Sequence, residues 1–416
     1  MKKILLLMLL IYAELIYGQT LTLKSAIKKT LLHHPDVKRF MLGLEVSKED
    51  YHSKYANYLP QVNLSATYAP IQTYALPVNG TFHTVDKDGW NASIMVKQKI
   101  WDFSQISSLV KASAIDIDIA KLSLNESKAM LSYRVKSLYK LLIIQKEAIK
   151  VRQKDLEVKK ALHKQAKGLV HQGLKTDADV SRFLSSVYIS KNNLAITQAS
   201  FEKAKNSLSL YMGEHLKNNI HFQSNLLNKS FKITPFIQSK ILNQNNRLQI
   251  DKLSEDKNRL LYQSKKSAHY GSIDLVASQS KFDTLNSYDA SYVGVSYSVP
   301  LYSGGRMSAE EQKAKIGYQM TKERSLSSSL SLKEELSSLT IDIKRYEKTI
   351  QAKKSQIRAD TKTEKVLLAR YKDGLSTYIE LLDSRSSVLN ARLSLLEAYY
   401  ARSLMIDRID YLQGKI

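Results

Sequence analysis

The chain has no cysteine, and this absence excludes disulfide bonds, cysteine-ligated metal sites, thiol catalysis and lipid attachment through a cysteine. Proline and glycine are also scarce, with 6 and 14 among 416 residues. Because these residues separate the short elements of β-sandwiches and conventional α/β enzymes, their scarcity favours long uninterrupted helices. Beyond residue 18 no apolar run of about 18 residues occurs, so we expect no transmembrane helix in the rest of the chain.

Positive charge is the main excess in the composition. Lys and Arg number 63 against 39 Asp and Glu, which gives a formal net charge of +24. The basic residues are spread along the whole chain, and no nucleic-acid reading motif accompanies them. We therefore interpret them as solvated helix faces and expect no nucleic-acid partner.

Residues that could carry catalysis or bind a metal form no recognisable pattern. The nine His and the scattered Asp and Glu show no grouping of nucleophile, base and orienting residue, so we expect no enzymatic activity and no cofactor. His33 and His34 are adjacent, but neighbouring histidines rarely hold one ion without further ligands. No metal site is expected.

The first 18 residues have the layout of a secretory signal peptide. Two lysines precede an apolar run, and Gly18 stands before Gln19 at the expected cleavage point. We expect an exported protein from which residues 1–18 are removed. Because the chain has no cysteine, we also expect that it is not lipid-anchored.

The sequence contains one structural unit written twice. Gly173 and Gly374 lie in similar segments 201 residues apart, and Trp101 and Tyr302 keep the same separation. The earlier part of each half aligns only at a larger shift, so the first half contains extra residues. We place them in a loop at 69–89. Such a duplication indicates a structural repeat.

Each predicted repeat has the order helix, strand, strand, very long helix, helix. The repeats cover 19–213 and 235–416, with a linker at 214–234. The predicted strands are 60–70, 90–101, 271–281 and 291–302. The predicted helices are 25–57, 104–171, 176–212, 247–269, 305–373 and 376–412. The fold class is mainly α with a smaller β part.

Apolar and polar residues alternate along the four predicted strands. Each strand has about ten residues, which is enough for a tilted strand to cross a bilayer. Aromatic residues stand at the ends of the runs, as in the interfacial girdles of membrane sheets: Trp90, Trp101, Tyr292 and Tyr302. The same pattern fits a small soluble sheet, and the strands alone leave both interpretations open.

The two predicted long helices, 104–171 and 305–373, would each reach roughly 100 Å at 1.5 Å per residue. The last helix carries two apolar stripes, one with Leu382 and Leu389 and the other with Leu381 and Val388. Two stripes indicate neighbours on both sides, as in the wall of a hollow cylinder.

Four strands per chain are too few to close a membrane barrel. Open strand edges cannot lie in lipid, because their N–H and C=O groups would lack partners. Membrane-spanning strands would therefore require several chains to share one barrel. Two copies would supply eight strands and three would supply twelve, and cyclic symmetry permits both.

Three segments together resemble the TolC family of outer-membrane exit ducts. They are PQVNL at 60–64, VSYSVPLYSGGR at 295–306, and YKDG at 371–374 continuing through Leu381-Leu382-Asp383 into Leu389-Asn390-Ala391. The duplicated layout covers nearly the whole chain after residue 18.

The resemblance implies a homotrimer in which a twelve-stranded outer-membrane β-barrel continues into a twelve-helix periplasmic α-barrel tunnel. It implies a passive, water-filled exit duct of a tripartite efflux pump or a type I secretion system. The partners would be a periplasmic adaptor (membrane fusion) protein and an inner-membrane pump of the RND or ABC type. The location would be the outer membrane of a Gram-negative bacterium, with an extension into the periplasm.

The resemblance also assigns roles to residues at and after the two glycine turns. The adaptor-docking tips would be Gly173, Leu174, Gly374 and Leu375. Glu380 and Asp383 would ring the pore entrance, where carboxylates around a narrow opening attract cations. Asp179 and Tyr371 would hold neighbouring coils together in the closed state. Ser376 departs from the basic residue that the family has at its position.

A second interpretation, from another class, is a periplasmic coiled-coil adaptor or scaffold protein with a small soluble β-sheet. Cell fractionation separates the two interpretations, because a scaffold would appear in the soluble periplasmic fraction without detergent.

Overall fold

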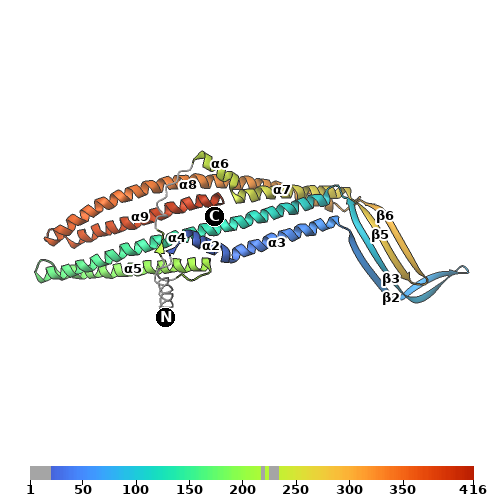
Figure 1. Cartoon of the computed structure of the whole chain (residues 1–416), viewed down its shortest axis with the longest axis horizontal. Coiled ribbons are helices and arrows are strands. Elements are labelled where there is room, and N and C mark those ends of the chain that lie inside the picture. Colours follow the sequence, from blue (N-terminus) through green and yellow to red (C-terminus); the bar gives the residue numbers. More distant parts are fainter. Residues whose placement is uncertain (1–19, 217–220, 224–233) are drawn as a thin grey trace, which may run out of the picture. The chain divides into compact units, whose positions relative to one another are not determined.

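The computed structural model describes residues 20–216, 221–223 and 234–416. The predicted signal peptide and most of the predicted linker at 214–234 lie outside the described residues. The fold is mainly α with one antiparallel sheet of four strands (Figure 1), as the sequence predicts.

The long helices carry most of the chain. The helices are α2 (Leu23–His33), α3 (Pro35–Tyr55), α4 (Gln105–His171), α5 (Asp177–Met212), α6 (Pro235–Gln244), α7 (Asn246–Ser267), α8 (Arg306–Lys372) and α9 (Tyr378–Leu412). The strands are β1 (Thr20–Leu21), β2 (Gln61–Val78), β3 (Thr81–Trp101), β4 (His221–Phe222), β5 (Ser272–Asp283) and β6 (Ser287–Ser298). Two 3₁₀ turns, η1 (Ala56–Tyr58) and η3 (Ala268–Tyr270), precede β2 and β5.

The chain divides into two compact units, and each unit takes segments from both repeats. Unit 1 comprises Met1–Arg39, Asn125–Asn246 and Leu330–Ile416, and unit 2 comprises Phe40–Leu124 and Arg247–Ser329. The duplication is therefore a repeat of sequence and of element order rather than a pair of separately folded domains.

Unit 2 contains the antiparallel sheet, with the strand order β2-β3-β5-β6 (Figure 1). The register places Val62 opposite Val96, Val96 opposite Ala277, and Ala277 opposite Val293. Because directly opposed residues share a face, apolar positions of all four strands lie on the same face. Val62 and Val293 are 65% and 77% exposed, so this apolar face is open in the single chain.

The β2–β3 hairpin corrects the predicted loop at 69–89. β2 runs to Val78 and β3 begins at Thr81, so nearly all of this segment is strand. Pro70 lies at a register shift, and Pro77 lies in β2, which is an edge strand of the sheet. Bulges and edge strands tolerate proline, since a missing N–H there need not break the hydrogen-bond ladder. The two strands consequently continue beyond the ends of β5 and β6 (Figure 1).

β6 differs from the predicted strand at 291–302. It begins at Ser287, directly after a short hairpin turn that follows β5, and it ends at Ser298. Pro300 lies just beyond that end and cannot donate a backbone hydrogen bond to a ladder. The long helices α4 and α8 begin and end within one residue of the predicted bounds.

The predicted single helix at 25–57 is divided at His34 into α2 and α3. His34 has an extended backbone, because proline at position 35 disfavours the helical conformation in the residue before it. Asn245 makes the same division between α6 and α7, and α6 was not predicted. The N–H of each dividing residue donates to the carbonyl oxygen four positions earlier.

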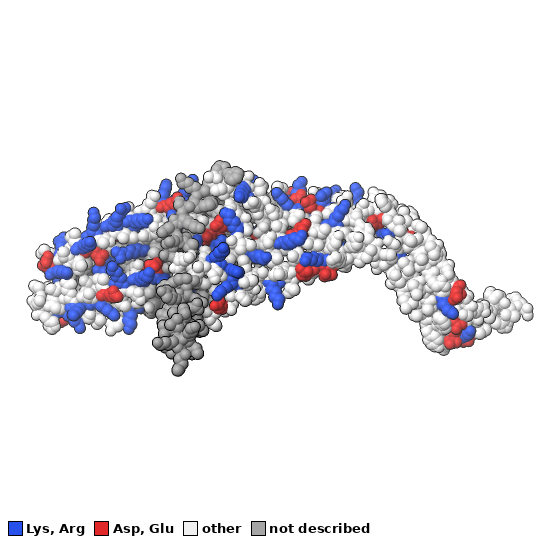
Figure 2. Space-filling model, viewed as in Figure 1, with Lys and Arg blue, Asp and Glu red and all other residues white. Residues whose placement is uncertain are grey.

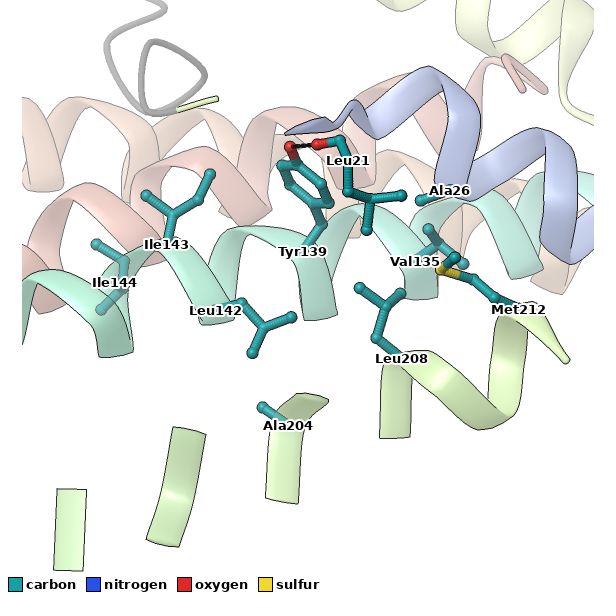
Figure 3. Packing of buried hydrophobic residues seen from close by; sticks show 10 residues of the cluster. All are labelled: Leu21, Ala26, Val135, Tyr139, Leu142, Ile143, Ile144, Ala204, Leu208 and Met212. Carbon is teal, nitrogen blue, oxygen red and sulfur yellow. Dashed lines mark hydrogen bonds between the residues drawn. The ribbon is translucent and has the colours of Figure 1, made fainter. Parts of the chain in front are cut away.

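The core of unit 1 joins residues that lie far apart in the chain (Figure 3). Tyr139 of α4 is fully buried, and its hydroxyl donates to the carbonyl oxygen of Leu21 and accepts from the N–H of Gln223. Leu208 of α5 and Ala26 of α2 belong to the same cluster. β1 pairs in parallel with β4, so the segment after α5 is held near the beginning of α2.

Among the described residues, no helix combines the length and the apolar character that crossing a membrane requires.

Candidate functional site

The candidate site is the pair of turns that join α4 to α5 and α8 to α9, both in unit 1 (Figure 1). In the first turn, Gly173 has a φ of 70°. Its N–H donates to the carbonyl oxygen of Val170 at 2.9 Å, and the N–H of Leu174 donates to that of Leu169 at 3.0 Å. This paired arrangement is the Schellman motif, in which glycine supplies the left-handed conformation that ends the helix.

The second turn repeats the geometry of the first. Gly374 has a φ of 76°, its N–H donates to the carbonyl oxygen of Tyr371 at 3.2 Å, and the N–H of Leu375 donates to that of Arg370 at 2.8 Å. The leucine that follows each glycine is exposed, by 59% at Leu174 and 68% at Leu375. The four predicted tip residues therefore form two matching turns, each with an exposed apolar side chain.

A capping box follows each turn and begins the next helix. The carboxylate of Asp179 accepts from the N–H and hydroxyl of Thr176, both at 3.2 Å. The carboxylate of Glu380 accepts from the N–H of Thr377 at 2.8 Å and from its hydroxyl at 3.1 Å. Asp179 and Glu380 thus occupy equivalent positions of the two repeats and have the same structural role.

This capping role affects the two residues predicted for the pore entrance differently. The hydrogen bonds from Thr377 hold the pKa of Glu380 below its ordinary value of 4.5, so its carboxylate is ionised near neutral pH. Asp383 lies one turn further along α9, and its side chain is exposed. Asp383 therefore has the more freely available of the two charges.

Tyr371 lies in a buried cluster between α8 and α5. It is fully buried, and its ring meets that of Phe183 edge to face, with centroids 5.7 Å apart. Burial, with a further contribution from the charge of Asp179, raises the pKa of Tyr371 to about 12. The two residues predicted to act together are thus electrostatically coupled, although in the described part of the chain the Tyr371 hydroxyl has no hydrogen-bond partner.

Lys175 links the two turns directly, and this contact was not predicted. Its ammonium group donates to the carbonyl oxygen of Ser376 at 3.2 Å and lies 4.9 Å from the centre of the Tyr371 ring. Ser376 and Lys175 are equivalent positions of the two repeats. A basic side chain at the first turn therefore reaches the position at which the second turn has a serine. A contact between turns 201 residues apart leaves no signal in the local sequence. The capping boxes do leave one, because the first turn is followed by Thr-x-x-Asp and the second by Thr-x-x-Glu.

We expect Thr377→Ala to destabilise the start of α9 by about 1 kcal/mol, because the helix loses its side-chain cap. Hydrogen exchange of the first turn of α9 should become faster, while Thr363→Ala, on the exposed surface of α8, should leave it unchanged. The stabilisation of the folded state by the Glu380 carboxylate should be fully present above pH 4.5. It should be lost as the pH falls through the lowered pKa of Glu380. Equal exchange rates in wild type and Thr377→Ala would contradict this role.

Comparison with known proteins identifies the family. The model of the outer membrane efflux protein family matches residues 26–214 and 237–408, with one match in each half of the chain. The chain belongs to this family. Its members are passive channels of the outer membrane rather than enzymes, so the resemblance to TolC-type exit ducts is confirmed.

Solved structures of outer-membrane channels share the fold. CusC is 16% identical, with a TM-score of 0.84 over 95% of this chain and 92% of that one. VceC of Vibrio cholerae is 16% identical, with a TM-score of 0.82 over 94% and 96%. MtrE of Neisseria gonorrhoeae, solved in an open state, is 17% identical, with a TM-score of 0.79 over 94% and 89%. No curated protein sequence matches the chain significantly.

Within the described residues, no group of three or more His, Cys, Asp or Glu is placed to hold a metal ion.

Proposed function

We propose that three copies of this chain form an exit duct that serves a tripartite efflux pump or a type I secretion system. Each copy would contribute four strands to a twelve-stranded outer-membrane barrel and its helices to a periplasmic tunnel. The observation that carries the proposal is the sheet, whose exposed apolar face and unpaired outer edges of β2 and β6 occur together in the described chain. Lipid can cover such a face only if neighbouring copies pair the edges.

The two turns would be the periplasmic end of the tunnel. Leu174 and Leu375 are exposed there on turns of equal geometry, which supports their proposed role as docking tips for an adaptor protein. Asp383 and Glu380 would supply negative charge at the entrance. Tyr371 would hold the coils together through Phe183 and the Lys175 ammonium group rather than through a hydrogen bond to Asp179.

Purification in detergent and planar-bilayer recording test the proposal. We expect an SDS-resistant trimer that conducts ions, and we expect the protein in the outer-membrane fraction, released only by detergent. A monomer in the soluble periplasmic fraction would support the scaffold interpretation instead. The signal peptide at 1–18 and the absence of a lipid anchor belong to the same proposal, and the mass of the mature protein tests both.

We expect Asp383→Ser and Glu380→Lys to weaken block by multivalent cations and to shift ion selectivity toward anions in single-channel recordings. The reason is that carboxylates around a narrow opening concentrate cations. Asp383→Ser should act on conduction alone, while Glu380→Lys should also loosen the start of α9 because it removes a capping residue. Glu255→Gln, an exchange of an acid in unit 2, is the control. Unchanged block in both entrance variants would refute the entrance assignment.

A further inference from the structure

The end of α8 that leads into the second turn has a face made of basic side chains. Five exposed residues follow one another at steps of four, four, three and seven, which places them on one face of the helix: Lys354, Arg358, Lys362, Lys365 and Lys372. We call these five residues the basic stripe. Figure 2 shows Lys and Arg outnumbering Asp and Glu on the visible surface near the two turns.

The acidic residues of the same stretch are turned away from the basic stripe. Asp360 and Glu364 are the acids between the first and last residues of the stripe, and both are half-buried. Glu364 forms an ion pair at 2.7 Å with Arg385 of α9, and the two side chains are only 16% and 11% exposed. In the described chain, no residue of the basic stripe forms an ion pair, so its charge is not neutralised within the molecule.

The surroundings of the basic stripe favour a protein partner over a nucleic acid. A shallow, open surface pocket on this part of α8 is lined by Ile357 and Thr361 as well as by three members of the stripe. Val366 is 58% exposed, and Leu375, in the turn that follows, is 68% exposed. Among the described residues, the ring next to the stripe is that of Tyr399, which lies 5.7 Å from the Lys354 ammonium group and is only partly exposed. Single-stranded nucleic acids are held in large part by stacking on exposed rings. A surface that combines basic side chains with a few exposed apolar ones is complementary to a partner helix that carries acidic and apolar side chains.

We propose that the basic stripe of α8 docks an acidic helix of a partner protein, whose Glu and Asp side chains pair with Arg358, Lys362 and Lys365 while its apolar side chains cover Val366 and Leu375. The inference rests on the proposed function, because a duct presents this end of α8 to a periplasmic adaptor. It adds the chemistry of that partner, which must be acidic along its contact helix.

The test uses the purified full-length protein in detergent and a labelled synthetic helix with three Glu at steps of four and three, which matches the spacing of Arg358, Lys362 and Lys365. A second peptide with Gln at those positions is the neutral counterpart. The variant R358E/K362E/K365E reverses three charges of the stripe. K313E/K315E/K322E, on exposed positions of α8 in unit 2, makes the same change in net charge and is the matched control.

We expect the Glu peptide to bind wild type and control within twofold of each other, and at least tenfold more weakly to R358E/K362E/K365E. Binding should weaken with salt, because the pairs are exposed and screened, and a peptide with Lys in place of Glu should prefer the stripe variant. Equal weakening in both variants would show general charge attraction only and overturn the inference. Tighter, stripe-dependent binding of a single-stranded oligonucleotide would overturn it as well.

Bilayer recordings of the same proteins separate this inference from the proposed function. Wild type that conducts ions but does not bind the Glu peptide overturns the inference alone, whereas wild type that forms no channel overturns the proposed function. We expect the stripe variant to conduct with the ion selectivity of wild type. A reversed selectivity would place the stripe in the lumen and would also overturn the docking assignment.

Discussion

We expect Lys140→Met to lower the free energy of unfolding by about 3–5 kcal/mol, because it leaves Asp407 charged and buried without its partner. The ammonium group of Lys140 in α4 lies 2.6 Å from a carboxylate oxygen of Asp407 in α9, and the two side chains are 6% and 8% exposed. The same ammonium group also donates to the carbonyl oxygen of Ser403. The pair therefore joins the long helix of one repeat to the last helix of the other, deep within unit 1.

The loss should depend on pH in a defined direction. Burial raises the pKa of Asp407, and Lys140 counteracts that rise, so the variant should have a still higher pKa. Above this raised pKa the folded variant must hold a bare carboxylate. As the pH falls through it, the folded state takes up a proton that the unfolded state binds only at lower pH, so the deficit should shrink.

Guanidinium unfolding of wild type and Lys140→Met at pH 7.5 measures the loss of stability, and the same experiment at pH 5 measures how far that loss shrinks. Lys150→Met removes an exposed ion pair with Glu147 and should cost less than about 1 kcal/mol. The double variant K140M/D407L should recover most of the loss, because a buried pair replaced by apolar residues is often neutral. A deficit in the double variant equal to that of Lys140→Met would show that packing, rather than the unpaired charge, causes the loss.

The second large effect is expected at Tyr371. Tyr371→Ala should lower the free energy of unfolding by about 3–5 kcal/mol, because it leaves a cavity at a fully buried aromatic site between α8 and α5. Hydrogen exchange should become faster in the first turns of α5 as well as in the last turn of α8. Tyr188→Ala is the control, since that side chain is 62% exposed on α5 and should change stability by less than about 0.5 kcal/mol.

Tyr371→Phe separates the ring from the hydroxyl. Because the hydroxyl has no hydrogen-bond partner in the described chain, its removal should leave stability equal or slightly higher. Wild type should lose stability as the pH rises from 10 toward the pKa of about 12, since only the unfolded state releases the proton in that range. Unfolding at pH 9 and pH 11 should show this loss in wild type and a smaller one in the phenylalanine variant. An identical alkaline loss in both proteins would exclude Tyr371 as its source.

Periodic and repeated features of the chain could be predicted from sequence. The 201-residue spacing located both turns, and the scarcity of proline and glycine located α4 and α8. Alternation along the strands identified the apolar face, because the side-chain period of two holds whatever the strands pair with. The hairpin beyond residue 69 was missed for a physical reason: Pro70 and Pro77 are strand breakers only where a ladder needs their N–H.

Long-range contacts could not be predicted in this way. The Lys175 contact with Ser376 and the Lys140 pair with Asp407 join segments that only the fold brings together. The family resemblance suggested a role at the pore entrance for Glu380. The structure adds a second role, as part of the capping box of α9, which the sequence already indicated because Thr377 stands three positions earlier.

The unequal lengths of β2 and β6 limit how much of the sheet hydrocarbon could cover in the proposed trimer. β2 has 18 residues and β6 has 12. If β2 pairs with β6 of the next copy, as in the proposed trimer, the far part of β2 would have no opposing backbone on that copy. Hydrocarbon cannot solvate those amide groups, whereas water can. In the proposed trimer, the hydrocarbon boundary would therefore lie no farther along the sheet than Trp90, where β3 pairs with the last residue of β5. The rest of each β2–β3 hairpin would extend beyond the hydrocarbon into water.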